Sequence, residues 1–120
     1  MKPGIKKLTP SKEFETAERC FITEIANDLN DTAISIARAR VAPGMTTQRH
    51  QLRDVSERYI ITSGQGRVEV GELPPTDVDA GDVVQIPPNT PQRITNTGTA
   101  DLIFFAVCSP RFTPECYQPA

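Results

Sequence analysis

Residues 44–64 read GMTTQRHQLRDVSERYIITSG, and this stretch decides the fold. It contains the only histidine of the chain, His50, and it ends in an apolar, β-branched run before Gly64. Two extended runs in this stretch are predicted as strands, over 46–52 and 57–62, separated by a charged turn. In a strand that points His50 inward, every second neighbour points inward with it. The stretch therefore predicts two short strands that direct polar groups toward an interior.

The rest of the chain continues this pattern of short extended runs with glycine and proline between them. Such runs at regular spacing predict an all-β sandwich or barrel. A helical period is suggested only over 11–20. The additional strands are predicted at residues 21–26, 33–41, 67–70, 83–86, 92–96 and 102–107.

Length and composition indicate one ordinary globular domain. A chain of 120 residues can bury a single core but is short for two. We expect an N-terminal arm at 1–19, a barrel domain at 20–109, and a C-terminal tail at 110–120 that packs back on the barrel. The tail is rich in proline and aromatic residues, which favours a structural role.

Charge and hydropathy exclude several classes of function. The net charge is −2, and no basic stripe is present, so we expect no nucleic-acid partner. No apolar run approaches the ~18 residues that span a bilayer, and the first residues lack the apolar centre of a secretory leader. The 3 cysteines form no C-x-x-C pair and suit a reducing compartment. We therefore expect a cytoplasmic protein with no membrane association.

A second stretch, residues 81–96, reads GDVVQIPPNTPQRITN. Together the two stretches resemble the two conserved motifs of the cupin superfamily, and every spacing of those motifs is kept. Three residues depart from the motifs: Leu52 stands for the second histidine, Asn89 for a glycine, and Gln92 for the third histidine. The resemblance covers roughly residues 33–108.

The resemblance implies a single-domain jelly-roll barrel, the double-stranded β-helix of RmlC-like cupins. It also implies a homodimer and a divalent metal held inside the barrel by three histidines and a glutamate. Carried over residue by residue, the candidate metal ligands here are His50, Glu57 and Gln92. One imidazole, one carboxylate and one amide are a poor set for zinc or nickel, which favour nitrogen and sulfur donors. A harder ion of unidentified kind, completed by water, remains an alternative to the interpretation we favour, a buried hydrogen-bond network.

The same register predicts a small-molecule pocket. Its expected lining is apolar on the side of the leucine and aromatic on the side of the tyrosine. In a metal-free reaction the histidine would act as base and the tyrosine as acid, so His50 and Tyr59 are the candidate catalytic residues. The expected pocket residues are Gln48, Leu52, Tyr59, Gln92 and Phe104.

Two arginines, Arg38 and Arg40, share one face of the strand predicted at 33–41. If that face lined the barrel, the guanidinium groups would suit a carboxylate or phosphate ligand. If it lay on the sheet surface, the arginines would pair with Asp or Glu. We favour the second arrangement.

Three functions remain open at this point. We expect a small cupin with an interior pocket for a small-molecule ligand, with or without a weakly bound divalent metal. The alternatives are a metal-dependent enzyme of dioxygenase, isomerase or lyase type, and a non-catalytic sensory or structural module.

Overall fold

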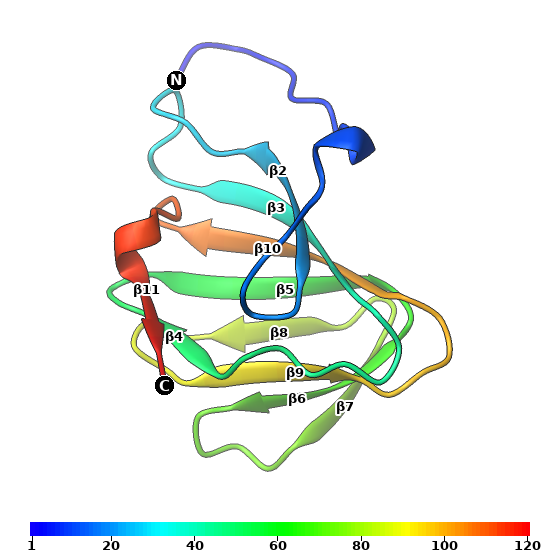
Figure 1. The fold of residues 1–120 in the computed structure, drawn as a ribbon. Coiled ribbons are helices and arrows are strands. Elements are labelled where there is room, and N and C mark those ends of the chain that lie inside the picture. Colours follow the sequence, from blue (N-terminus) through cyan, green and yellow to red (C-terminus); the bar gives the residue numbers. More distant parts are fainter.

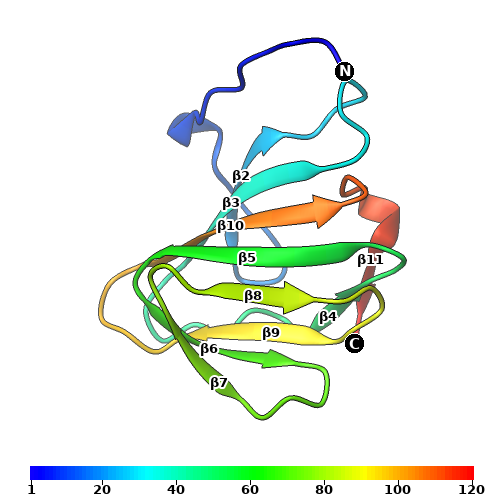
Figure 2. The same cartoon turned by 180° about the vertical axis from the view of Figure 1, so that it is seen from behind.

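The computed structural model describes residues 1–120 as two antiparallel sheets that face each other (Figures 1 and 2). One sheet has the strand order β1-β2-β3-β10-β5-β8, and the other has the order β11-β4-β9-β6-β7. The strands are β1 (Phe14–Glu15), β2 (Phe21–Ala26), β3 (Ser35–Val41), β4 (His50–Leu52), β5 (Ser56–Ser63), β6 (Gln65–Val70), β7 (Thr76–Asp79), β8 (Val83–Ile86), β9 (Gln92–Asn96), β10 (Leu102–Ser109) and β11 (Tyr117–Pro119). Two short 3₁₀ helices, η1 (Pro10–Lys12) and η2 (Pro114–Cys116), complete the chain. The all-β jelly-roll prediction is confirmed.

The core lies between the sheets because side chains alternate along each strand. In β5, Glu57, Tyr59 and Ile61 are buried, whereas the intervening Arg58 and Ile60 are exposed. Full burial of one large apolar side chain contributes about 1.5–3 kcal/mol. The main cluster of buried residues comprises Cys20, Ala39, Val41, Tyr59, Ile61, Val68, Val70, Val78, Val84, Ile86, Ile94, Leu102 and Phe104.

Strand β3 turns its small side chains inward and its two arginines outward. Ser35, Ala39 and Val41 are buried, so Arg38 and Arg40 occupy the opposite face. Arg40 forms ion pairs at 2.6 Å to Glu13 and 3.4 Å to Asp101. Its guanidinium carbon also lies 4.2 Å from the ring centroid of Phe21. This is the surface arrangement favoured from the sequence, and it removes these cations from the interior.

Local backbone differs from the expected pattern in several places, of which three affect the element assignment most and a fourth is the short strand β11 in the tail. Residues 11–20 form no α-helix: they contribute to η1 and β1, and Phe14 and Glu15 pair with β2. The strand expected from 46 begins only at His50, with Thr46 making an isolated bridge to Thr95. Strand β7 was not expected, because the two prolines before it obscure a short run that pairs with β6.

Asn89, which stands where the motif has a glycine, adopts a backbone conformation that glycine adopts readily. Asn89 has φ of 60°, a left-handed conformation that asparagine adopts more readily than most residues. Its Oδ1 accepts a hydrogen bond of 3.1 Å from the backbone N–H of Asp54. The substitution therefore preserves the turn and ties it to the turn between β4 and β5.

Segments near the two termini pack on the barrel, although the N and C termini themselves lie far apart (Figure 1). The N-terminal segment adds β1 to the edge of the first sheet, and the tail adds β11 to β4 at the edge of the second (Figure 1). Tyr117 pairs there with Leu52, and Pro119 pairs with His50. Both ends thus supply side chains to the space between the sheets. The structure contains no helix with the length and apolar character needed to cross a membrane.

Candidate functional site

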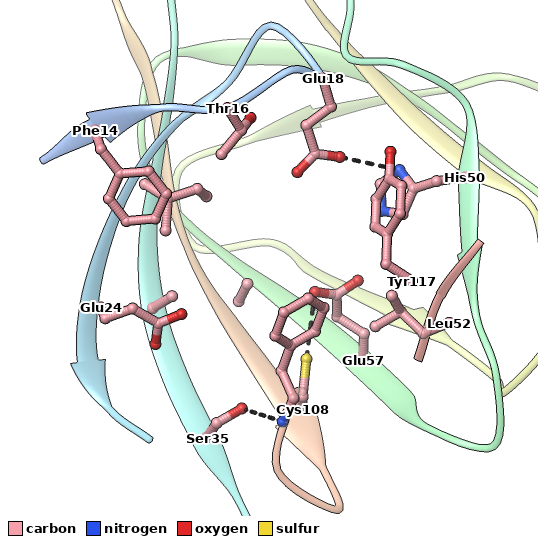
Figure 3. A pocket seen from close by; sticks show the side chains of 14 residues that line it. Phe14, Thr16, Glu18, Glu24, Ser35, His50, Leu52, Glu57, Cys108 and Tyr117 are labelled. Atoms are coloured by element: carbon pink, nitrogen blue, oxygen red, sulfur yellow. Dashed lines mark hydrogen bonds and ion pairs between the residues drawn. The ribbon is translucent and has the colours of Figure 1, made fainter. Parts of the chain in front are cut away.

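A cavity of about 170 Å³ opens between the two sheets, beside residues of the N-terminal segment and of the C-terminal tail (Figure 3). Strands β2, β3 and β10 form one wall, and β4 with β11 forms the opposite one. The N-terminal segment borders the opening. The lining residues are Phe14, Thr16, Glu18, Ile22, Glu24, Ser35, Ala37, His50, Leu52, Glu57, Ala106, Cys108, Phe112 and Tyr117.

His50 is held in one orientation by contacts to its ring. Its Nδ1 lies 2.9 Å from the carbonyl oxygen of Gln48 and 3.3 Å from Oε2 of Glu18. The ring stacks on Tyr117, with centroids 4.9 Å apart and planes inclined by 19°. Because the carbonyl can only accept, Nδ1 donates to it, and a neutral ring then carries its lone pair on Nε2. Nε2 makes no hydrogen bond within the protein, so it is available to a ligand.

Glu18 and Tyr117 were not found by sequence reasoning. Glu18 lies on the N-terminal segment and Tyr117 on the tail, and neither belongs to a motif. Figure 3 shows both side chains beside the His50 ring. Oε2 of Glu18 is buried and has no hydrogen-bond partner. The one sequence signal was that polar and aromatic residues occur in both terminal segments, which does not specify where they pack.

A hydrogen-bond chain connects the floor of the cavity to the core. The Tyr59 hydroxyl donates to Oε1 of Gln92, and Nε2 of Gln92 donates to Oε1 of Glu57 at 2.8 Å. The Cys108 thiol donates to the other carboxyl oxygen, Oε2, at 3.5 Å. The chain fixes the amide of Gln92, because its oxygen must face the hydroxyl and its nitrogen the carboxyl. The buried hydrogen-bond network favoured from the sequence thus includes Glu57 and Gln92. His50 is not part of it and is hydrogen-bonded to the Gln48 carbonyl instead.

Burial controls the ionisation of the two carboxyls nearest the histidine. Burial raises the pKa of Glu57, and the hydrogen bond from Gln92 and the nearby His50 only partly oppose the rise. Burial also raises the pKa of Glu18, against the opposing effects of His50 and Tyr117. A carboxyl with a raised pKa holds its proton to higher pH and can serve as an acid.

The structure distributes the other predicted residues differently from the expected pocket. Leu52 lines the cavity, but Tyr59, Gln92 and Phe104 lie deeper in the core and do not. The Tyr59 ring packs on Phe104 with centroids 4.3 Å apart. Gln48 is half-buried and lines an outer groove beside Glu18 and Tyr117. Strand alternation fails for Gln48 because the backbone before His50 is irregular.

The residues present do not fit a resident divalent metal. The amide of Gln92 turns its nitrogen toward Glu57 and its oxygen toward Tyr59, so this oxygen does not face an ion shared with Glu57. Leu52 occupies a position from which it cannot coordinate. No cluster of three or more His, Cys, Asp or Glu side chains has metal-binding geometry. The predicted set of His50, Glu57 and Gln92 is therefore not assembled as a ligand sphere.

The comparisons with known proteins agree with this architecture. The family model described as Cupin domain matches residues 37–108, which is more than half of the chain, and the protein belongs to this family. It is 32% identical over 81 residues to an uncharacterised protein of Methanocaldococcus jannaschii. That match covers 68% of this chain and 64% of the relative, so the chain spans less than two thirds of the relative's length.

Two solved structures show the same fold at low identity. KdgF from Halomonas sp. has a TM-score of 0.81 and 13% identity, with 95% of this chain and 99% of that chain covered. A variant of Pac13 from Streptomyces, solved with uridine, has a TM-score of 0.78 and 20% identity, with 95% and 89% covered. Pac13 is described as a nucleoside dehydratase. At this level of identity the likenesses show the shared double-stranded β-helix fold. The reaction has to be argued from the residues of the site.

Proposed function

We propose that this protein is an acid–base enzyme of lyase type, which eliminates water from a small organic molecule without a metal. The observation that carries the proposal is the arrangement of His50 in the cavity. Nδ1 is bonded to the Gln48 carbonyl, and Nε2 is unpaired. A base positioned in this way has its proton-accepting atom free and its opposite edge fixed.

Glu18 supports the role of His50 as base. When Nε2 takes a proton, the ring becomes an imidazolium, and the Oε2 atom of Glu18 lies 3.3 Å from Nδ1. The positive charge of the ring favours the ionised form of Glu18 against the effect of burial, and the resulting carboxylate stabilises the imidazolium and holds the ring in place, as in other histidine-based sites. Tyr117 covers the ring face and limits its rotation.

Glu57 is the proposed acid. Burial raises the pKa of its carboxyl, and the side chain reaches the cavity floor. In an elimination, the substrate C–H bond breaks as Nε2 takes the proton, and the C–O bond breaks as the leaving hydroxyl takes the proton of Glu57. The products are an alkene and water, and proton transfer from the imidazolium to the Glu57 carboxylate restores both residues.

Tyr59 does not serve as the acid in this scheme. Its hydroxyl is buried and donates to Gln92, which in turn holds Glu57. Tyr59 is therefore a positioning residue in the proposal. The fold likeness to Pac13, described as a nucleoside dehydratase, supports a dehydration on this scaffold, and the metal-dependent alternative loses support because no ligand sphere is assembled.

The proposal is tested by NMR in D₂O with a panel of small 3-hydroxy carbonyl compounds, using chelator-treated protein. We expect deuterium exchange at the carbon next to the carbonyl, followed by alkene formation. His50→Gln should remove both, and Glu57→Gln should retain exchange while slowing alkene formation by about 100-fold, within the usual range for a general acid. Glu72→Gln, an exposed carboxyl outside the cavity, is the matched control.

Two results would contradict the proposal. Turnover that disappears with the chelator and returns with a divalent ion would restore the metal-dependent interpretation. Binding of panel members without exchange or elimination would favour the non-catalytic alternative.

A further inference from the structure

We propose that the cavity selects ligands by charge and accepts uncharged or cationic molecules that donate hydrogen bonds, while it rejects organic anions. This inference rests on the proposed function for the identity of the site and names the class of substrate. It follows from the charges that line the cavity, their hydrogen-bond states, and the position of the cations of the chain.

The cavity wall contains acidic groups and no permanently basic ones. Glu18, Glu24 and Glu57 are among the lining residues, together with His50 as the only nitrogenous side chain. None of the 13 lysine and arginine residues of the chain lines it. An anionic ligand would therefore meet several carboxyls and no guanidinium or ammonium group.

The nearest candidates for an anion-binding cation face elsewhere. Arg38 and Arg40 lie on β3, which forms a cavity wall, but both project from its outer face. Arg40 is bound there by Glu13 and Asp101. Arg19, next to Glu18 in sequence, donates from Nε to the Thr46 carbonyl at 2.8 Å. Reaching the cavity would require Arg40 and Arg19 to leave these partners.

Three hydrogen-bond donors in the cavity are already occupied, and the hydroxyls of Ser35 and Tyr117 are the other side-chain donors in its lining. The Thr16 hydroxyl donates to the Cys20 carbonyl at 2.8 Å, and the Cys108 thiol donates to Glu57. Nδ1 of His50 is bonded to the Gln48 carbonyl. A carboxylate ligand, which only accepts, would find few donors for its lone pairs and would lose the hydrogen bonds it makes with water.

Acceptors, by contrast, are left open. Oε2 of Glu18 is buried without a hydrogen-bond partner, its nearest polar contact being Nδ1 of His50 at 3.3 Å, and Nε2 of His50 is unpaired. A buried acceptor without a partner destabilises the free protein, so a ligand hydroxyl, amide or ammonium group that donates to it gains affinity. The lining is also apolar at Phe14, Leu52 and Phe112, which suits the carbon skeleton of such a ligand.

The size of the cavity sets the size of the ligand. A cavity of roughly 150 Å³ holds a benzene molecule, and this one measures about 170 Å³. One six-membered ring with a small substituent therefore fits. An anion of that size would lie close to the carboxyls that line the cavity, and their ionised forms, which mildly alkaline buffer favours, would repel it.

Three probes of the same planar shape separate charge from size: benzamide is neutral, benzamidine is cationic, and benzoate is anionic. Dissociation constants are measured by NMR titration of labelled full-length protein in mildly alkaline buffer, following the cavity signals of His50 and Leu52. We expect benzamide and benzamidine to bind at least about tenfold more tightly than benzoate, a difference of about 1.4 kcal/mol.

A matched pair of variants identifies the cause. Glu24→Gln removes one carboxyl at the exposed margin of the cavity and should strengthen benzoate binding by a few-fold. Glu72 lies outside the cavity, so Glu72→Gln should leave all three dissociation constants unchanged. Both positions are exposed, so both variants should fold.

The inference is overturned if benzoate binds as tightly as benzamide, or if neither benzamide nor benzamidine shifts the cavity signals. These titrations measure binding and involve no reaction. Charge selection without elimination activity would support this inference and contradict the proposed function. Elimination activity without charge selection would support the proposed function and contradict this inference.

Discussion

Replacement of Glu57 by glutamine should make the protein more stable at neutral pH, by an amount that grows with pH. The carboxyl is almost fully buried, with 8% exposure of the residue, and burial raises its pKa above the ordinary value. Between the unfolded and the folded pKa, the folded state keeps the proton and the unfolded state loses it. The unfolded state then binds fewer protons, so the free energy of unfolding falls as pH rises through that interval.

The stability difference between the two proteins is limited because it comes from the binding of a single proton. The slope cannot exceed about 1.4 kcal/mol per pH unit, and it ends once the folded carboxyl has ionised. Below the unfolded pKa both the wild type and Glu57→Gln carry a neutral group, so their stabilities should be similar. The amide also keeps an oxygen that can accept from Gln92, which preserves the contact of 2.8 Å.

The assay is urea unfolding of both proteins over a series of pH values, with the difference in unfolding free energy plotted against pH. Subtracting the unfolding free energies of the two proteins cancels the pH dependence that other carboxyls contribute. These include Glu13 and Glu69, whose pKa values are lowered by hydrogen bonds from arginine. We expect a difference that increases from acidic to neutral pH. A difference that stays constant, or that favours the wild type at neutral pH, would refute the account of Glu57 as a buried carboxyl with a raised pKa.

Four further predictions concern the fold, the polar network and the assembly. Tyr59→Phe should lower the free energy of unfolding by about 1–3 kcal/mol, measured by urea unfolding, because it leaves Oε1 of Gln92 buried without a donor; unchanged stability would contradict the hydrogen bond. Asn89→Ala should cost about 1 kcal/mol through its positive φ, whereas Asn89→Gly should be closer to neutral by the same assay. Leu52→His combined with Gln92→His should raise affinity for Ni²⁺ by at least about 100-fold in calorimetric titration, since each imidazole is a better donor than water, and no gain would contradict the inward placement of both positions. The homodimer expected from the family remains a prediction, and light scattering of the purified protein would contradict it by giving a monomer mass.

Much of the fold could be predicted because strand alternation and turn residues are local signals. The strands at 21–26, 83–86 and 92–96 have the predicted bounds, since each is an alternating run between turn-forming residues. The start of β4 was misplaced because residues 46–49 are all polar and carry no local signal of where the strand begins. Local polarity cannot distinguish an irregular segment held by a few long-range bonds from a strand.

The site was only partly predictable, because its composition depends on contacts between distant segments. The motif positions gave His50 and Glu57, which lie at the cavity, and Leu52 beside them. The sequence could not show that Glu18 and Tyr117 complete the surroundings of the histidine, since they reach it from opposite ends of the chain. It also could not show that Gln92 separates Tyr59 from the cavity, because both side chains point inward and only their depth differs.

The most direct test of the central claim is long-range ¹H–¹⁵N NMR of the imidazole, which is unambiguous because the chain has 1 histidine. At a pH where the ring is neutral, the account predicts the tautomer protonated at Nδ1, with the lone pair on Nε2 and an Nε2 signal that shifts when benzamide is added. A ring protonated at Nε2, or an Nε2 signal that ignores the ligand, would contradict the assignment of His50 as the base that faces the cavity.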